Sequence, residues 1–548
     1  MKIVIYIVIL RDFMKRLLIL LSFVIASLNS NAEVLTARDS AIIWQTKKFR
    51  TILLTAVKNY KDTVDIKKIS EAAFSAMLES LDPYSNYLRE DVYQHFKSNY
   101  FKTVRTTGIE IISIKDTLFV LYVRPDSPAE KAGIVPGDKI IYLAGKSAIG
   151  MNVKEANKEL TVKDSIAKPI NIVIKRYATP GLNEQFLMPE EMPIISVTSY
   201  FILPGTDIGY IKSKRFSKTA DSVFRLALKL LMKQGAKSII FDIRGHQGGQ
   251  VKAAADIVDE FIPEGKTITY IEGKNNKYFQ KYISEPGNIG EDIPLVVLID
   301  NHTMSAAEIF AGAIQDLDRG VLVGDISYGK GMAQKSWSFK DGSAFRLTIG
   351  DYYSPIGRNI QKPHKTKKME LDPALKLSMG NKSFKNIEKE IAKFNGQAKI
   401  PTFTTPKGRL VLGGGGIFPD YFALPDTTTL LTRVLKKKSI LIEAAFQYLD
   451  IYRDEILNKY GDNYRKFIKE FSVSDEMLKQ MEIVSRMRNI WNEKMFLTDK
   501  EYIRNFYKSL LVYFLWGDDA FFMNESANDK VLKAGIKHIT DAVKLFEN

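Results

Sequence analysis

The stretch that decides the fold of this chain is residues 293–334, IPLVVLIDNHTMSAAEIFAGAIQDLDRGVLVGDISYGKGMAQ. Its unbroken apolar run, 294–299, predicts a buried parallel strand, and residues 306–317 carry apolar side chains at helical spacing. Ser305 lies on the turn between these two elements. A serine there has its hydroxyl lifted off the end of the sheet, beside the free N–H groups of the helix, which suits a nucleophile.

Ser305 and Glu308 also fit an S-x-x-E capping box, a local structure that needs no function. What favours chemistry lies downstream. Residues 321–324 predict a second strand, which leads into a tight loop where Lys330 stands between two glycines. Parallel strands of one sheet open at the same carboxyl edge, where α/β folds gather their reactive groups. We therefore expect Ser305 and Lys330 to share that edge.

A serine hydroxyl is a poor nucleophile until a base takes its proton. Lys330 is the candidate base, because burial can lower the pKa of a lysine by several units and leave its amine neutral. The flanking glycines allow the backbone to approach closely, and Gln334 is spaced to accept a hydrogen bond from the amine and orient it. The sequence thus predicts a Ser/Lys dyad that needs no histidine, metal or cofactor.

The runs S-A-A-E-I-F-A-G-A-I-Q-D and V-G-D-x-S-Y-G-K-G-x-x-Q resemble the catalytic core of the C-terminal processing (tail-specific) serine proteases. In that family the serine before A-[SA]-E-I is the nucleophile, the lysine of G-K-G is the base and the glutamine four residues later orients it. The resemblance implies these roles for Ser305, Lys330 and Gln334. It covers roughly residues 77–420 and implies a multidomain α/β chain with a crotonase-like protease core.

A glycine loop, RGHQGG at 244–249, follows a predicted strand at 238–243 and precedes a predicted helix at 253–261. It is similar to the family's D-L-R-x-N-x-G-G loop. The resemblance implies that the amides of Gly248 and Gly249, with that of Ala306, form an oxyanion hole.

Other polar residues near this loop have alternative interpretations. Asp242 and Arg244 are expected to form a structural ion pair. The family's asparagine is replaced here by His246, so a mechanism in which this histidine activates the serine stays open, with His302 as a second candidate. The pattern G-K-G-x-x-Q favours Lys330 over both.

Residues 104–178 have the organisation of a PDZ domain, β-rich with two helices. Such a domain binds a peptide as an added strand beside a helix, here 152–160, and holds its carboxylate in backbone N–H groups. The peptide-binding residues are predicted to be Thr107, Gly108, Ile109 and Glu110, although the family usually has a more glycine-rich loop. A spacer or lid is the alternative. A linker is expected at 179–191.

The amino terminus predicts an export signal, residues 1–32. Lys15 and Arg16 precede an apolar segment at 17–26, and cleavage is expected after Ala32. Met14 is an alternative start, and an uncleaved anchor is an alternative fate of the segment. This signal implies the periplasm or cell envelope of a Gram-negative bacterium. Residues 33–103 predict helices, and their end, MLESLDPYSNYL at 77–88, is similar to the stretch before the PDZ domain in the family. The sequence assigns it no chemistry.

Composition bounds the partners. The chain has 548 residues, 45% of them hydrophobic, and no cysteine, which excludes disulfides and thiolate zinc sites. Its five histidines lack H-x-x-x-H spacing, so no metal is expected. The net charge of +16 is spread along the chain, which favours solvated faces over a nucleic-acid site. A basic surface is compatible with peripheral association with an anionic envelope.

The remaining boundaries follow from composition. The protease core is predicted at 190–424, with a charged insertion at about 362–411, and a helical region rich in aromatic residues follows at 425–548. Apolar residues at helical spacing there predict a bundle packed on the core. Homo-oligomerisation and docking of an adaptor are its alternative roles.

Together these features predict an exported serine endopeptidase that recognises apolar C-terminal tails of proteins through its PDZ domain. One alternative is a non-catalytic PDZ-bearing binding or adaptor protein on the same scaffold. Another is a crotonase-like acyl-CoA enzyme, against which the export signal and the PDZ domain argue.

Overall fold

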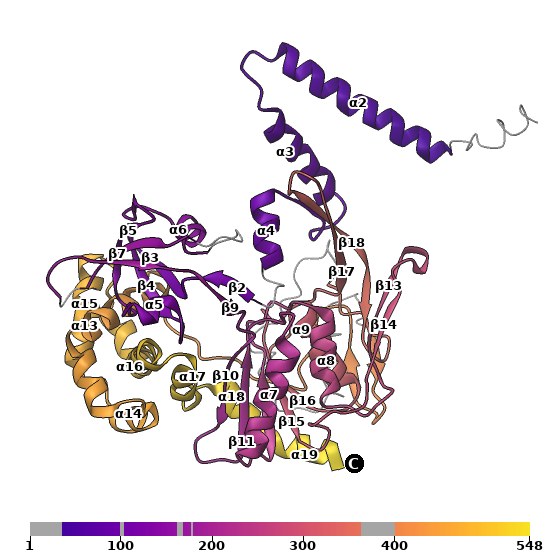
Figure 1. The fold of residues 1–548 in the computed structure, drawn as a ribbon. Coiled ribbons are helices and arrows are strands. Elements are labelled where there is room, and N and C mark those ends of the chain that lie inside the picture. The colour runs from indigo at the N-terminus through magenta and orange to yellow at the C-terminus, as the bar shows by residue number, and fades with distance from the viewer. Residues whose placement is uncertain (1–35, 99–102, 162–167, 177–178, 363–400, 548) are drawn as a thin grey trace, which may run out of the picture. The chain divides into compact units, whose positions relative to one another are not determined.

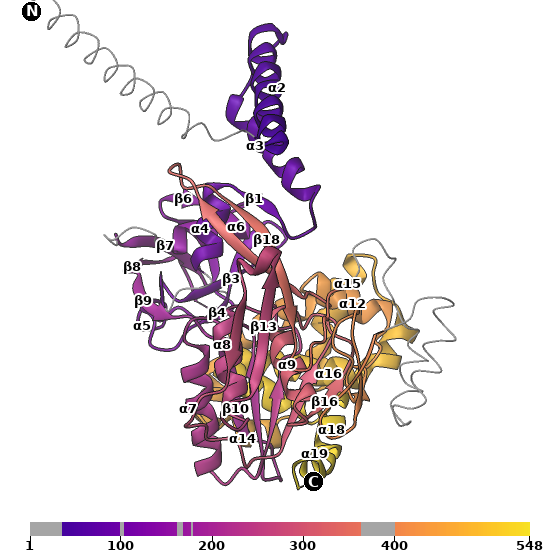
Figure 2. The ribbon, with the colours of Figure 1, turned by 90° about the vertical axis from the view of Figure 1, so that its right-hand side faces the viewer.

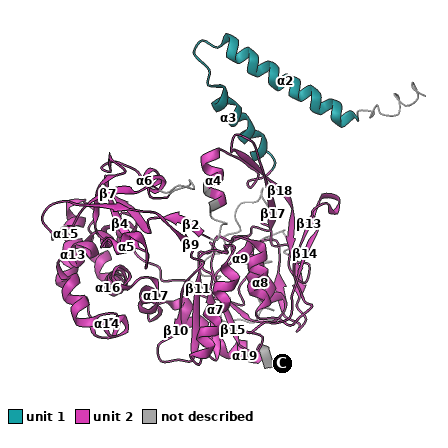
Figure 3. Cartoon of the chain, in the orientation of Figure 1, with its two compact units in different colours: residues 1–81 teal, residues 82–548 magenta. Residues whose placement is uncertain are grey.

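The computed structural model of the protein describes residues 36–98, 103–161, 168–176, 179–362 and 401–547. The predicted signal peptide and most of the predicted insertion lie outside these residues. The chain divides into two compact units, residues 1–81 and 82–548 (Figure 3). Among the described residues, no helix has the length and apolar character needed to cross a membrane.

The described part of the first unit, residues 36–81, contains two helices, as predicted. α2 (Ala37–Asn59) begins at a capping box formed by Thr36 and Asp39, and α3 (Ile66–Glu79) begins at Asp65, whose side chain accepts the N–H of Lys68. α2 has no buried residue.

The centre of the second unit is a six-stranded sheet in the order β10-β11-β12-β15-β16-β21 (Figure 1). β10 is antiparallel to β11, and the strands from β11 to β21 are parallel. Every residue of β12, β15 and β16 is buried, as expected for parallel strands covered on both faces. The strands are β10 (Val197–Ile202), β11 (Ile208–Ser213), β12 (Ser238–Asp242), β15 (Leu295–Ile299), β16 (Val321–Gly324) and β21 (Tyr421–Phe422).

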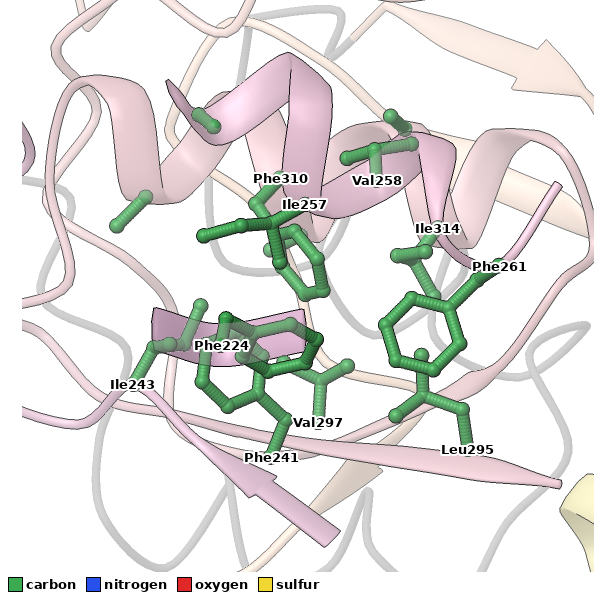
Figure 4. Packing of buried hydrophobic residues seen from close by; sticks show 14 of the residues in the cluster. Phe224, Phe241, Ile243, Ile257, Val258, Phe261, Leu295, Val297, Phe310 and Ile314 are labelled. Carbon is green, nitrogen blue, oxygen red and sulfur yellow. The ribbon is translucent and has the colours of Figure 1, made fainter. Parts of the chain in front are cut away.

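Helices cover both faces of this sheet. α7 (Ala220–Lys233), α8 (Val251–Asp259) and α9 (Ala306–Asp316) pack on one face, where Phe241 of the sheet contacts the rings of Phe224 and Phe310 at centroid distances of 4.8 and 5.0 Å (Figure 4). α18 and α19, at the end of the chain, pack on the other face. This packing fixes the strand ends that carry the candidate site.

A second sheet lies beside α8 and α9 (Figure 2). Its order is β1-β18-β13-β14, with β17 also paired to β18. The strand β1 lies in the predicted segment 77–88, whose residues from 82 onward belong to the second unit. The elements are β1 (Asn86–Leu88), α4 (Glu90–Ser98), β13 (Thr267–Gly273), β14 (Gln280–Ile283), β17 (Met332–Ser338) and β18 (Ala344–Tyr353), with short strands β19 (Thr402–Thr404) and β20 (Leu410–Leu412) paired to each other.

The region predicted as a PDZ domain contains a third sheet, β3-β4-β5-β7-β8, with β6 paired to β5. The predicted linker at 179–191 is wrong, because β8 extends this sheet and β9 pairs with β2. The elements are β2 (Thr103–Thr106), β3 (Ile109–Ile114), β4 (Thr117–Val123), α5 (Pro128–Lys131), β5 (Lys139–Leu143), β6 (Lys146–Ser147), α6 (Val153–Leu160), β7 (Ile170–Lys175), β8 (Asn183–Leu187) and β9 (Glu190–Pro193).

The C-terminal region is helical, as predicted, and it packs on more than the protease core. Ile114 and Phe119 of the third sheet share a hydrophobic cluster with α12, α13 and α16, and the ring of Phe119 stacks on Phe446 at 5.8 Å. The bundle therefore joins the third sheet to the central one. Its helices are α12 (Leu430–Lys437), α13 (Ile440–Tyr460), α14 (Tyr464–Glu470), α15 (Asp475–Met487), α16 (Glu493–Trp516), α17 (Asp518–Ser526), α18 (Lys530–Lys537) and α19 (Ile539–Glu547).

Candidate active site

Ser305 lies where the sequence places it, on the turn between β15 and α9. Its backbone has φ 59° and ψ −123°, a conformation that a residue with a side chain rarely adopts. Helix α9 and the buried strand β15 hold this strained turn at the carboxyl edge of the central sheet. A strained turn from strand to helix is the geometry that presents a nucleophile.

The glycine loop touches this turn. A Cβ atom at Gly248, whose φ is +85°, would lie 2.8 Å from the Cβ of Ser305 and 3.1 Å from the amide nitrogen of Ala306. At Gly249, a Cβ would lie 2.1 Å from the carbonyl oxygen of Phe216. Both positions therefore exclude a side chain, and this is the physical reason for the glycine pair.

The amides assigned to an oxyanion hole differ in their partners. Within the described part of the chain, the N–H groups of Gly249 and Ala306 have no hydrogen-bond acceptor. The N–H of Gly248 instead donates to Nδ1 of His246 at 3.0 Å. An oxyanion could therefore be received directly by two of the three predicted donors, whereas Gly248 would have to share or exchange its bond.

His246 is fully buried, and its ring contacts Phe216 at a centroid distance of 4.2 Å. Because Nδ1 accepts a hydrogen bond, we assign the ring proton to Nε2, which has no partner among the described residues. Burial, followed by the charge of Lys212, lowers the pKa of His246 to about 3. Neither ring nitrogen offers a free lone pair to Ser305, so the geometry does not favour His246 as the base.

The other histidine candidate, His302, is exposed over 73% of its side chain. Its Nδ1 lies 3.8 Å from a carboxylate oxygen of Asp300, and its backbone N–H donates to the same side chain. The ring is thus neither buried nor held by a short hydrogen bond, which does not favour a catalytic role.

Lys330 follows β16, so both predicted strand-to-loop junctions lie at one edge of the sheet. Burial, followed by the nearby charge of Arg346, lowers the pKa of Lys330 from 10.5 to about 8. Its Nζ lies 5.2 Å from the centroid of the Tyr84 ring. A lysine with this pKa is partly neutral near pH 8 and can accept a proton.

Glu308 links the serine turn to the lysine loop, and its side chain is buried. One carboxylate oxygen accepts the N–H groups of Ser305 at 2.9 Å and Lys330 at 2.8 Å. The other accepts the N–H of Gly329 at 2.6 Å and the hydroxyl of Ser327 at 2.5 Å. Burial raises the pKa of Glu308, and the hydrogen bonds from Ser327 and the loop amides oppose that shift.

Only the contact of Glu308 with the serine turn could be predicted from the sequence. S-x-x-E predicted the bond between Glu308 and the N–H of Ser305, which the structure contains. The bonds to the lysine loop span about twenty residues and depend on the neighbouring strands β15 and β16 lying side by side. We found no signal in the sequence that would have revealed them.

Gln334 lies in β17, at a bulge opposite β18. Its side-chain amide donates to the carbonyl oxygen of Met332 at 2.9 Å. The contacts that the structure gives for Gln334 do not include Lys330, so its orienting role stays a prediction.

The predicted ion pair of Asp242 and Arg244 is present and buried, with a closest N–O distance of 2.6 Å. Burial alone would raise the pKa of Asp242, but the charges of Arg244 and Lys212 outweigh it and hold the pKa well below its usual range. Arg244 also pairs with Asp529 at the start of α18 at 2.6 Å. The C-terminal helices thus brace the strand that leads into the glycine loop.

The predicted peptide-binding residues lie at the start of β3, which is the outer strand of the third sheet. The N–H of Thr107 donates to the carbonyl oxygen of Leu160 at 3.3 Å, and that of Gly108 to the hydroxyl of Thr106 at 3.2 Å. Ile109 is buried and Glu110 is exposed. A carboxylate bound here would have to displace the internal partners of the two amides.

No group of three or more metal-ligating side chains is close enough together to hold a metal ion in the described ranges.

Parts of this chain are similar to known proteins. Residues 207–371 match the model of peptidase family S41, and residues 431–517 match a family of unknown function, DUF8443. The carboxy-terminal processing protease CtpA of Bacillus subtilis (strain 168) is 31% identical over 305 residues, which are 56% of this chain and 64% of that protein. The chain thus spans slightly less than two thirds of that relative.

Two further proteins extend the comparison. The carboxyl-terminal-processing protease of Synechocystis sp. (strain ATCC 27184 / PCC 6803 / Kazusa) is 30% identical over 53% of this chain and 68% of its own length. The solved structure of the photosystem II D1 C-terminal processing protease is 26% identical, with a TM-score of 0.34 over 60% of this chain and 86% of that one.

These comparisons, on a chain built around a parallel α/β sheet, define a serine-type peptidase. The chain belongs to peptidase family S41, the carboxyl-terminal processing proteases.

Proposed function

We propose that the protein is a serine endopeptidase that acts on protein substrates near their C-terminal tails, with Ser305 as nucleophile and Lys330 as general base. The observation that carries this proposal is the shared carboxylate of Glu308, which binds the backbone N–H of both residues. The serine turn and the lysine loop are thereby held as one body, as a dyad requires.

The proposed reaction uses groups of this chain alone. Neutral Lys330 takes the proton of the Ser305 hydroxyl as Oγ bonds to the carbonyl carbon of the substrate. The negative charge that develops on the carbonyl oxygen is stabilised by the amides of Gly249 and Ala306, joined by Gly248 if its bond to His246 is exchanged. Lys330 then gives its proton to the leaving amine, and water releases the acyl group from Ser305.

Substrate recognition is proposed to occur at the third sheet, which would serve as a PDZ domain attached to a crotonase-like core. β3 is an outer strand and α6 lies next to it, an arrangement suited to adding an extended peptide. Apolar residues of the tail would then lie between this strand and this helix. The named relatives are processing proteases, which supports a protein substrate.

We also propose export to the periplasm or cell envelope, on the basis of the signal predicted at residues 1–32. Association with the envelope surface and homo-oligomerisation through the helical region belong to the same proposal.

A non-catalytic adaptor is the second candidate, since the third sheet could deliver tails to a partner. A single test separates the two. The protein from residue 33 onward is incubated with a loosely folded reporter ending in an apolar tail, and with the same reporter ending in a charged tail. Ser305→Ala, Lys330→Ala and His246→Ala are compared with the wild type.

The proposal expects cleavage of the apolar-tailed reporter, loss of cleavage in the first two variants and retention in the third. Loss in His246→Ala with survival of Lys330→Ala would contradict the assignment of the base. Binding of both tailed reporters without cleavage by the wild type would favour the adaptor.

A further inference from the structure

The segment before the third sheet reaches the candidate active site. Its residues D-P-Y-S, 82–85, form a tight turn in which one carboxylate oxygen of Asp82 accepts the N–H groups of Tyr84 and Ser85, both at 2.8 Å. The hydroxyl of Ser85 donates to the other oxygen at 2.7 Å and accepts the N–H of Thr348 at 3.1 Å. The turn is therefore fixed to β18, and β1 continues the attachment.

This anchoring places the ring of Tyr84 against Lys330. The lysine Nζ lies 5.2 Å from the ring centroid, within the range of a cation–π contact. The ring is only partly exposed, and it lies outside the residues matched by the S41 model. One side of the amine is thus covered by a residue more than two hundred positions away in the chain.

Gln361 ties the same tyrosine to the backbone of the lysine loop. The phenol of Tyr84 is hydrogen-bonded to the side chain of Gln361, whose Oε1 accepts the N–H of Gly331 at 2.9 Å. A Cβ at Gly331 would lie 2.9 Å from the amide nitrogen of Gln361, so the two strands of chain touch. The Tyr84 ring and the lysine loop are therefore held in a fixed position relative to each other.

We propose that Tyr84 is a positioning residue for the active-site lysine: its ring shields the Lys330 amine from water, and its hydroxyl, through Gln361, keeps the ring over that amine. This inference rests on the proposed role of Lys330 as the base. It also gives the D-P-Y-S segment a role that the sequence alone did not assign.

The ring acts on the lysine in two opposite directions. Its π face stabilises the charged ammonium, whereas its bulk removes water and stabilises the neutral amine. Burial is the largest cause of the lowered pKa of Lys330, and the ring covers part of the amine. We therefore take shielding as the larger of the two effects. Removing the ring should hydrate the amine and raise its pKa.

The test measures the titration of Lys330 directly. In a Ser305→Ala background, competitive acetylation followed by mass spectrometry of the Lys330 peptide reports the fraction of neutral amine at each pH. We expect a midpoint near 8 with Tyr84 present and a rise of about one unit in Tyr84→Ala. Tyr84→Phe keeps the ring but loses the hydrogen bond to Gln361, so its midpoint should rise by less than that of Tyr84→Ala.

Cleavage of the reporter is measured in parallel with Ser305 intact. The acidic limb of kcat/KM should move to higher pH in Tyr84→Ala, which lowers activity about tenfold at pH 7 and little above pH 10. Tyr87→Ala, which truncates another ring on the same segment, is the matched control and should leave the midpoint unchanged. Thermal unfolding checks folding, and Tyr84→Gln replaces Tyr84→Ala if the latter fails to fold.

A midpoint that stays in place or falls in the ring-free variant would overturn the inference. A midpoint that rises while the cleavage limb does not move would leave the shielding intact and contradict Lys330 as the base. The two failures are thus distinguishable, and the titration decides the role of Tyr84 even for a protein that cuts no reporter.

Discussion

The buried carboxylate of Glu308 offers the sharpest perturbation of the candidate site. Glu308→Gln keeps the shape of the side chain but replaces one acceptor oxygen by a donor NH2. Each oxygen of Glu308 accepts at least one backbone N–H from the serine turn or the lysine loop. Whichever way the new amide points, it therefore opposes at least one backbone donor.

The magnitude follows from the bonds involved. A hydrogen bond to a charged group contributes about 1.5 to 3 kcal/mol, and a buried donor left without an acceptor costs about 1 to 3 kcal/mol. We therefore expect Glu308→Gln to weaken the hydrogen bonding that holds the serine turn and the lysine loop by about 2 to 3 kcal/mol. If this loss appears in the transition state, kcat/KM falls about 30- to 150-fold.

The assay is cleavage of the apolar-tailed reporter, with thermal unfolding measured on the same samples. Glu476→Gln is the matched control, because its side chain is 82% exposed and forms only a surface ion pair with Lys479 among the described residues. Retention of more than a third of wild-type kcat/KM by Glu308→Gln would refute the reasoning.

Three other predictions follow from the structure. Lys330→Met removes a buried amine whose lowered pKa reduces the free energy of unfolding by up to about 3 kcal/mol below pH 8. The variant should therefore be inactive yet unfold at a higher temperature at pH 7, and this gain in stability should fade between pH 8 and 10.5. A lower unfolding temperature at pH 7 would contradict this. His246→Asn should keep kcat/KM within about fivefold of the wild type, because an asparagine oxygen can still accept the N–H of Gly248. The limit of about fivefold corresponds to one neutral hydrogen bond. Loss of cleavage would reopen a catalytic role for the histidine. Phe446→Ala should destabilise the packing of α13 on β4 by about 3 to 5 kcal/mol and speed amide hydrogen exchange in both elements. Unchanged exchange would contradict the shared cluster.

The central sheet could be predicted because its strands and helices carry strong local signals. The buried runs at β12, β15 and β16 are continuous and apolar, and each is followed by a turn and a helix or a glycine loop. Their parallel order then places Ser305 and Lys330 at one edge without any knowledge of side-chain contacts.

The contacts within the site could not be predicted, since they depend on residues far apart in sequence. Tyr84 reaches Lys330 only because β1 pairs with β18, and Glu308 reaches the lysine loop only because β15 and β16 are neighbours. The direction of the Gly248 amide depends on a positive φ and on the ring of His246, neither of which a motif specifies.

Weak strands explain the main error in the fold. The sequence NEQFL of β8 begins with three polar residues and follows a Pro-Gly pair, so it resembles a linker. It becomes a strand because the outer edge of β7 offers it a ladder of backbone hydrogen bonds. Tertiary pairing here outweighs local propensity.

The most direct test of the central claim is covalent labelling of the serine. The protein is treated with a fluorophosphonate across a range of pH, and the labelled peptide is identified by mass spectrometry. The account predicts a label on Ser305, formed at a rate that rises with pH through about 8, abolished in Lys330→Ala and retained in His246→Asn. A label on another serine, or labelling of Ser305 at the wild-type rate in Lys330→Ala, would contradict the Ser/Lys dyad.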